Sequence, residues 1–381
     1  MNNWFKITLL AALAVPLGCS EMEVDEAPLK AVSFAVGTYS PQTRADGDPV
    51  SVIDQDGITA FTSRGFLHSE GFIGTAQEFG DFFGEEGQKI SWHADTKEWL
   101  PPHDYYWPKG QKSYIDFISW YGGSPEITYA KNASSNKFEA TFAWNNVQVA
   151  ATDNLMWADL AWRYKANVNP ATYGKNEVAE GVPTLFHHAL SQVRFVGKVS
   201  KSSETVNGKT VKWTVNVKEF SISDVANKGT FSLTNVDPGG NEPKTQAWTV
   251  KDWTNLDGEA TITPSATYPI TLTETETEKE IVGWQSVIPQ STDAVKMTIK
   301  FSVVTEYEGA GGKKVEEEVT ASSVLLNKFK TGTGDNDYIK NWERNKRYTY
   351  TIIIEPDTGI IKLIPVEKDW IDAGIIDITV E

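Results

Sequence analysis

The sequence predicts an all-β protein, and three observations support this prediction. Runs in which apolar and polar residues alternate recur along the chain, as expected of strands with one buried face. Turns that contain glycine or proline separate these runs. Beyond the first 18 residues, no segment has the spacing of apolar residues that an amphipathic helix needs. We therefore expect many short strands packed as β-sandwiches, and no long helix.

Residues 1–18 have the features of a lipoprotein signal peptide. An apolar run from Ile7 to Leu17 follows a single lysine, and it is too short to cross a bilayer. The only cysteine of the chain, Cys19, comes directly after this run and Gly18, which resembles a lipobox. We interpret Cys19 as the lipidated residue, because several acyl chains give stable anchoring. A plain secretory signal with a chance cysteine is the alternative.

The charge and the cysteine content exclude several kinds of partner and of site. The chain has 35 basic and 51 acidic residues, a net charge of −16, and residues 19–30 form an acidic tether. Such a surface repels phosphate backbones, so we expect no nucleic-acid partner. One cysteine is too few for a disulfide scaffold or a cysteine-based zinc site.

The first expected strand follows the tether, at residues 31–37. Val32, Phe34 and Val36 alternate with small residues, so one face suits an apolar groove and the other permits close packing. A polar loop that contains a proline comes next and ends at Arg44 and Ala45. We expect this loop to be exposed and open to proteolysis.

Later strands are expected on both sides of a polar linker at residues 165–180. We place the domain boundary near Gly181, which gives an N-terminal sandwich over 31–181 and a C-terminal sandwich over 182–381. Alternation is clearest in residues 138–144, 213–217, 296–304 and 346–354. The alternation changes phase at Phe220 and Ile222, which indicates a bulge or a strand end. The glycines of 309–312 predict a hairpin. Residues 273–280 have the pattern of an edge strand or a loop.

Motifs of known chemistry are missing from the sequence. It has no Gly-x-Ser-x-Gly elbow, no His-Glu-x-x-His and no phosphate-binding glycine loop, so we expect no enzyme and no cofactor. His187 and His188 are adjacent and would point to opposite faces of a strand, which favours packing against aromatic rings over metal binding. The tryptophans of 92–162 could stack on sugars, but core packing is the better interpretation.

The order of these patterns resembles the fimbrillin and Mfa-like families of surface pili. No single stretch is specific, but together the similar stretches span nearly the whole chain. They are the lipoprotein start, VSFAVG at 32–37 with TRA at 43–45, WLPPHDYYWPKGQKSYIDFISWY at 99–121, PTLFHHALSQVRFVGKV at 183–199, the Pro-Gln pair at 289–290, NWERNKRYTYTIII at 341–354 and VEKDWIDAGIIDITV at 366–380.

The resemblance implies two transthyretin-like β-sandwich domains in tandem, an outer-membrane lipoprotein precursor, and assembly with other fimbrial subunits by strand exchange. It implies that an Arg-specific protease cuts between Arg44 and Ala45, so that the first strand leaves. The donor strand would be the C-terminal segment 374–381, in which Ile376, Ile378 and Val380 alternate. The stretch after this cleavage site matches the family pattern only loosely. The alternative function is that of a surface lipoprotein that binds a glycan.

Overall fold

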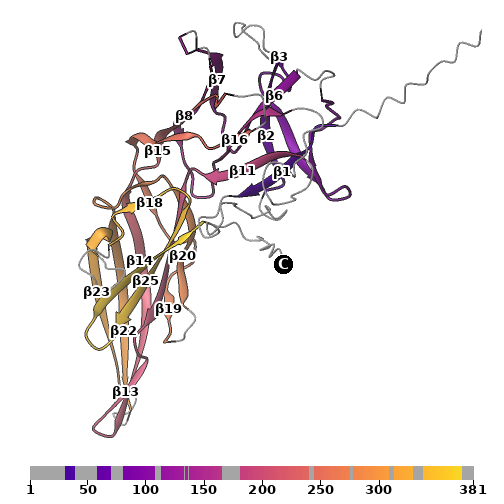
Figure 1. Cartoon of the computed structure of the whole chain (residues 1–381). Coiled ribbons are helices and arrows are strands. Elements are labelled where there is room, and N and C mark those ends of the chain that lie inside the picture. The colour runs from indigo at the N-terminus through magenta and orange to yellow at the C-terminus, as the bar shows by residue number, and fades with distance from the viewer. Residues whose placement is uncertain are drawn as a thin grey trace, which may run out of the picture.

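The computed structural model shows an all-β chain, as predicted (Figure 1). It describes residues 31–38, 58–69, 80–107, 113–132, 134–135, 137–164, 181–239, 244–274, 278–308, 313–328 and 338–370. In these residues the single helical element is a short 3-10 helix, Leu326–Lys328. No helix in the described ranges has the length and apolar character needed to span a membrane.

The strands form two lobes, an upper one and an elongated lower one (Figure 1). The upper lobe holds a ten-stranded sheet, and a pairing of β2 with β6 closes the strands from β6 round to β2 into a ring. In sheet order the strands are β16 (Lys244–Gln246), β10 (Leu160–Tyr164), β6 (Ser113–Tyr121), β9 (Met156–Ala158), β11 (Val182–His188), β1 (Phe34–Thr38), β5 (Glu98–Leu100), β4 (Gln88–His93), β2 (Ala60–Ser69) and β3 (Gly80–Asp81).

A four-stranded sheet packs against this ring and completes the upper lobe. An aromatic-rich core joins the two, with Trp144 and Phe231 from the smaller sheet against Trp157 and Trp162 from the ring. Its strands, in order, are β17 (Thr249–Asp257), β15 (Lys228–Val236), β8 (Phe138–Gln148) and β7 (Glu126–Lys131).

The lower lobe is built from two further sheets that enclose one apolar core. One sheet has the order β20 (Lys279–Val287), β12 (Ser191–Val199), β25 (Lys346–Glu355) and β26 (Ile360–Asp369). The other has the order β13 (Ser203–Val206), β14 (Lys209–Val225), β22 (Lys296–Tyr307) and β23 (Lys314–Leu325), with β18 (Ala260–Ile262) and β19 (Ile270–Leu272) also on β14. A short pair, β21 (Gln290–Ser291) and β24 (Asn341–Trp342), lies outside both sheets.

Local predictions hold well in this lobe. The predicted runs 296–304 and 346–354 lie in β22 and β25, and β22 pairs with β23 as the expected hairpin. The predicted change of phase is a register shift of β14 between Val217 and Glu219. Alternation is a property of neighbouring residues, so it survives whatever partner the strand finds.

Strand pairing connects segments on both sides of Gly181. β11 lies directly after this glycine and pairs with β1 and β9, while β15 pairs with β8 and β16 with β10. The division of the chain into two domains at this residue stays a prediction.

Candidate functional site around the first strand

The first strand, β1, lies inside the upper lobe and not at its edge. It pairs in parallel with β11, from Phe34 opposite Val182 to Thr38 opposite Phe186, and on its other side Phe34 pairs with Trp99 of β5. The N–H of Val32 also donates to the carbonyl of Tyr105 at 2.7 Å. β1 therefore closes the ring of strands between β11 and β5.

The side chains of this strand fill the centre of the ring, as the alternation predicted. Val32, Phe34 and Val36 are 0%, 3% and 3% exposed. The ring of Phe34 makes edge-to-face contacts with Phe61 and Phe117, at centroid distances of 5.6 and 5.4 Å. Full burial of a side chain of this size contributes about 1.5–3 kcal/mol, so these three residues are a large part of the local stability.

The backbone of β1 comes very close to Gly181. A Cβ atom on this glycine would lie 2.8 Å from the carbonyl carbon of Phe34 and 2.9 Å from the nitrogen of Ala35. Backbone atoms within a paired strand cannot move aside as a flexible side chain could. The site for the first strand therefore depends on a glycine that the alternation pattern did not single out.

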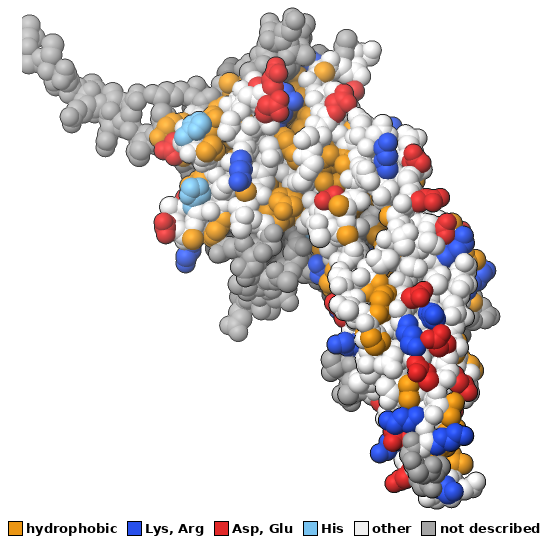
Figure 2. All heavy atoms as spheres, turned by 180° about the vertical axis from the view of Figure 1, so that it is seen from behind, with side chains coloured by type: hydrophobic (Ala, Val, Ile, Leu, Met, Phe, Trp, Pro, Cys, Tyr) orange, Lys and Arg blue, Asp and Glu red, His pale blue; other side chains and the backbone are white. Residues whose placement is uncertain are grey.

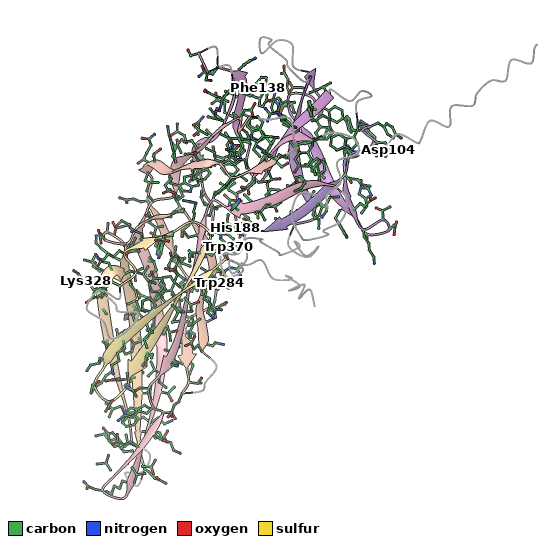
Figure 3. The ribbon with its side chains drawn as sticks, viewed as in Figure 1. Asp104, Phe138, His188, Trp284, Lys328 and Trp370 are labelled. Atoms are coloured by element: carbon green, nitrogen blue, oxygen red, sulfur yellow. The ribbon has the colours of Figure 1, made fainter. Side chains whose placement is uncertain are left out.

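The predicted processing and donor residues lie outside the described part of the chain. These are Cys19, Arg44, Ala45, Ile376, Ile378 and Val380. The last described residue is Trp370, which is 1% exposed and stacks on His188 of β11 with a centroid distance of 3.8 Å (Figure 3). Trp370 thus lies beside β11, the strand that pairs with β1.

The two adjacent histidines pack against different aromatic rings, as expected of strand neighbours. His187 stacks on Trp157 at 5.3 Å and its Nε2 lies 2.8 Å from Asp159 Oδ1. His188 stacks on Trp370, and its Nδ1 lies 2.9 Å from Asn154 Oδ1. Among the described residues, no group of three or more His, Cys, Asp or Glu side chains could hold a metal ion.

Arg64 is the next arginine of the sequence after Arg44, and it is part of the folded sheet. It lies in β2, between β4 and β6, and its guanidinium donates to both carboxylate oxygens of Asp81 at 3.0 Å. Its side chain is 18% exposed. Cleavage after Arg64 would require this part of the ring to open first.

The Trp-rich region 92–162 supplies the core of the upper lobe. Five of its tryptophans are at most 7% exposed, and Trp92 and Trp107 are partly buried. The five are Trp99, Trp120, Trp144, Trp157 and Trp162. Core packing, not sugar stacking, therefore accounts for this region.

A buried polar network in the upper lobe escaped the sequence analysis. Asp116 is fully buried, accepts the N–H of Arg163 at 2.6 Å and also accepts the hydroxyl of Tyr129. Arg163, at a φ of 59°, pairs with Asp237. Burial and the nearby Asp116 carboxylate raise the pKa of Tyr129 well above its usual range. These partners lie far apart in sequence, so no local signal marks them.

A family model for fimbrillin-like proteins matches residues 43–370. The chain belongs to the fimbrillin-like family. The match covers most of the chain, from directly before the predicted cleavage site to the last described residue. It confirms the resemblance seen in the order of sequence patterns.

Several solved structures are similar to this chain. A fimbrial protein from Bacteroides vulgatus is 13% identical, with a TM-score of 0.50 over 90% of this chain and 99% of that one, which indicates a shared fold. A protein from Bacteroides uniformis, named for an inferred role in cell adhesion, is 16% identical with a TM-score of 0.38 over 90% and 99%. The tip fimbrial protein Mfa3 from Porphyromonas gingivalis is 10% identical with a TM-score of 0.28 over 90% and 100%. No curated protein matches the chain.

Proposed function

We propose that this chain is a subunit of a cell-surface fimbria that assembles with other subunits by exchange of its first strand. The observation that carries the proposal is the position of β1, a terminal strand that lies between two partners and fills the core of the upper lobe. Family membership supports the fimbrial role and a place at the cell surface. A structural subunit needs no catalytic centre, so we do not assign one.

Loss of β1 would leave a site that a foreign strand can fill. The backbone groups of β11 and β5 would lose their partners, and the apolar contacts of Val32, Phe34 and Val36 would be replaced by a groove. Unpaired strand edges and exposed apolar surface are both costly in water. A strand from another subunit restores both the backbone pairing and the buried contacts, which is the physical basis of strand addition.

The donor in this proposal is the C-terminal segment 374–381 of a second subunit. Ile376, Ile378 and Val380 alternate in the same way as Val32, Phe34 and Val36, so they would occupy the same three positions in the groove. The backbone of the donor would also have to fit closely against Gly181, as the backbone of β1 does.

Maturation in this proposal has two steps. The precursor carries a signal peptide at 1–18 and is anchored in the outer membrane through lipidated Cys19. An Arg-specific protease then cuts between Arg44 and Ala45, which frees β1 from the rest of the chain. The mature chain in this proposal has two tandem domains, each a transthyretin-like sandwich. The two sheets that enclose one core in the lower lobe support this arrangement there.

The test uses two variants that block opposite ends of the reaction. Arg44→Ala keeps its first strand but can still donate, whereas deletion of 374–381 leaves a subunit that accepts but cannot donate. After treatment with an Arg-specific protease, the wild type should form ladders on unboiled SDS gels and each variant alone should not. A mixture of the two variants should stop at dimers.

Arg44→Lys is the matched control, because it keeps the positive charge and resists the protease. It should behave as Arg44→Ala does. Ladders formed by either variant alone would contradict strand exchange through these segments.

A further inference from the structure

The outer face of one lower-lobe sheet carries two arginines stacked on a tryptophan. Arg194 of β12, Trp284 of β20 and Arg347 of β25 lie on neighbouring strands. The guanidinium carbons of Arg194 and Arg347 lie 4.6 and 5.3 Å from the centroid of the Trp284 ring, whose place in the lower lobe is labelled in Figure 3. Their strand neighbours Val193 and Tyr348 point into the core, so these three side chains lie on the opposite, outer face. We call them the Arg–Trp–Arg surface.

A β-bulge places the tryptophan there. Val193 pairs with Gln285 and Phe195 pairs with Val282, so two residues of β20, Gly283 and Trp284, lie opposite the single residue Arg194. Bulges of this kind redirect a side chain and are frequent next to binding sites. The bulge turns the Trp284 ring over Arg194.

Each arginine donates a hydrogen bond from its Nε to a neutral side chain of the neighbouring strand. The Nε of Arg194 donates to the hydroxyl of Thr349 at 2.8 Å, and the Nε of Arg347 donates to the side-chain oxygen of Gln192 at 2.8 Å. Within the described part of the chain, Arg194 forms no ion pair with a carboxylate. The N–H groups of its two Nη atoms remain available to a ligand, and no carboxylate of the described residues neutralises its charge.

This arrangement differs from the cations of the opposite sheet. Lys218 is paired with Glu316 and Glu318 at 2.9 and 2.7 Å, and Lys300 with Glu318 at 3.4 Å. In the view of Figure 2, basic and acidic side chains are interleaved over the lower lobe. In a protein with a net charge of −16, a fixed arginine without a carboxylate partner is a local site for an anion.

We propose that the Arg–Trp–Arg surface binds a polysaccharide that carries carboxylate groups. The planar fork of a guanidinium matches a carboxylate with two parallel hydrogen bonds, and stacking on Trp284 fixes its orientation in advance. The next side chains in the same row are the Thr349 hydroxyl and Val366, which is 42% exposed. They offer a polar and an apolar contact to one sugar ring.

The position of the surface favours a sugar polymer over an acidic peptide. β12 and β25 are paired on both sides, so their backbone groups are used and an extended peptide cannot add to them as a strand. A stiff polymer with acid groups at regular intervals loses less conformational freedom on a flat face than a peptide does. The proposal goes beyond the fimbrial role and does not depend on strand exchange.

The experiment measures binding of the full chain to polygalacturonate by calorimetry, with neutral dextran as the uncharged control. The wild type should bind polygalacturonate with an affinity that falls as salt rises, and should not bind dextran. Arg194→Gln removes the charge at similar size and should weaken binding about tenfold or more, since one charge-assisted bidentate contact is lost. Lys218→Gln, a change of the same charge on the opposite sheet, should leave binding unchanged.

Four results would overturn the proposal. One is an absence of binding by the wild type, and another is an equal loss of binding in the Arg194→Gln and Lys218→Gln variants. The third is tighter binding to polyglutamate than to polygalacturonate, which would assign an acidic peptide to the surface. Heparin is included as a sulfated probe; weaker binding to it than to polygalacturonate supports carboxylate recognition, and tighter binding contradicts it. Because Arg194 lies on the sheet surface, both variants are expected to fold, and their thermal unfolding checks this.

Discussion

Truncation of Phe34 tests the role of the first strand most directly. The side chain is 3% exposed and makes edge-to-face contacts with Phe61 and Phe117. Removal of a buried phenylalanine ring costs about 3–5 kcal/mol, which includes the cavity it leaves. This range already contains the loss of the aromatic contacts, so we expect Phe34→Ala to cost about 4 kcal/mol, the middle of the range.

The assay is hydrogen exchange followed by mass spectrometry, because it reports stability segment by segment. A loss of about 4 kcal/mol corresponds to about a thousandfold faster exchange. We expect this acceleration in peptides that cover β1, β11 and β5, which form one ladder.

Phe301→Ala is the matched control, since Phe301 is fully buried in the lower-lobe core. It should accelerate exchange in β14 and β22 and leave β1 protected. Acceleration of less than about tenfold in β1 and β11 of the Phe34→Ala variant would refute the reasoning, because the first strand would then contribute little to the ring.

Three further predictions follow from single residues. Gly181→Ala places a Cβ against the backbone of Phe34, so we expect a loss of about 1–3 kcal/mol and faster proteolysis of the first strand; unchanged proteolysis would contradict the close approach. Burial raises the pKa of Tyr348 and Tyr350 in the folded state. The contribution of these tyrosines to the free energy of unfolding is fully present below the unfolded-state pKa of about 10. It is lost as the pH rises above that value, by up to about 1.4 kcal/mol per pH unit for each tyrosine. Urea unfolding at pH 8 to 11 checks this, and Tyr350→Phe should make the decline less steep. Cys19→Ala should move the protein from the membrane fraction to the soluble fraction; a variant that still partitions into detergent would show that Cys19 is not the anchor.

The alternation of residues predicted several strands and their buried faces correctly. The runs 296–304 and 346–354 are strands, and the buried side of β1 is the side that carries Val32, Phe34 and Val36. The change of phase in β14 was also visible. Each of these features follows from the period of two along one strand, which needs no knowledge of the partner.

The alternation of residues thus specifies an all-β chain and the inward face of its first strand, and the order of the motifs indicates the fimbrillin-like family. The pairing of the strands is visible only in the folded protein: β1 pairs with β11, β2 with β6 to close the ring, and β8 with β15. The bulge that sets Trp284 over Arg194 is likewise visible only in the folded protein. These features depend on contacts between residues far apart in sequence, whose register is fixed by how complete cores pack together and not by any local pattern.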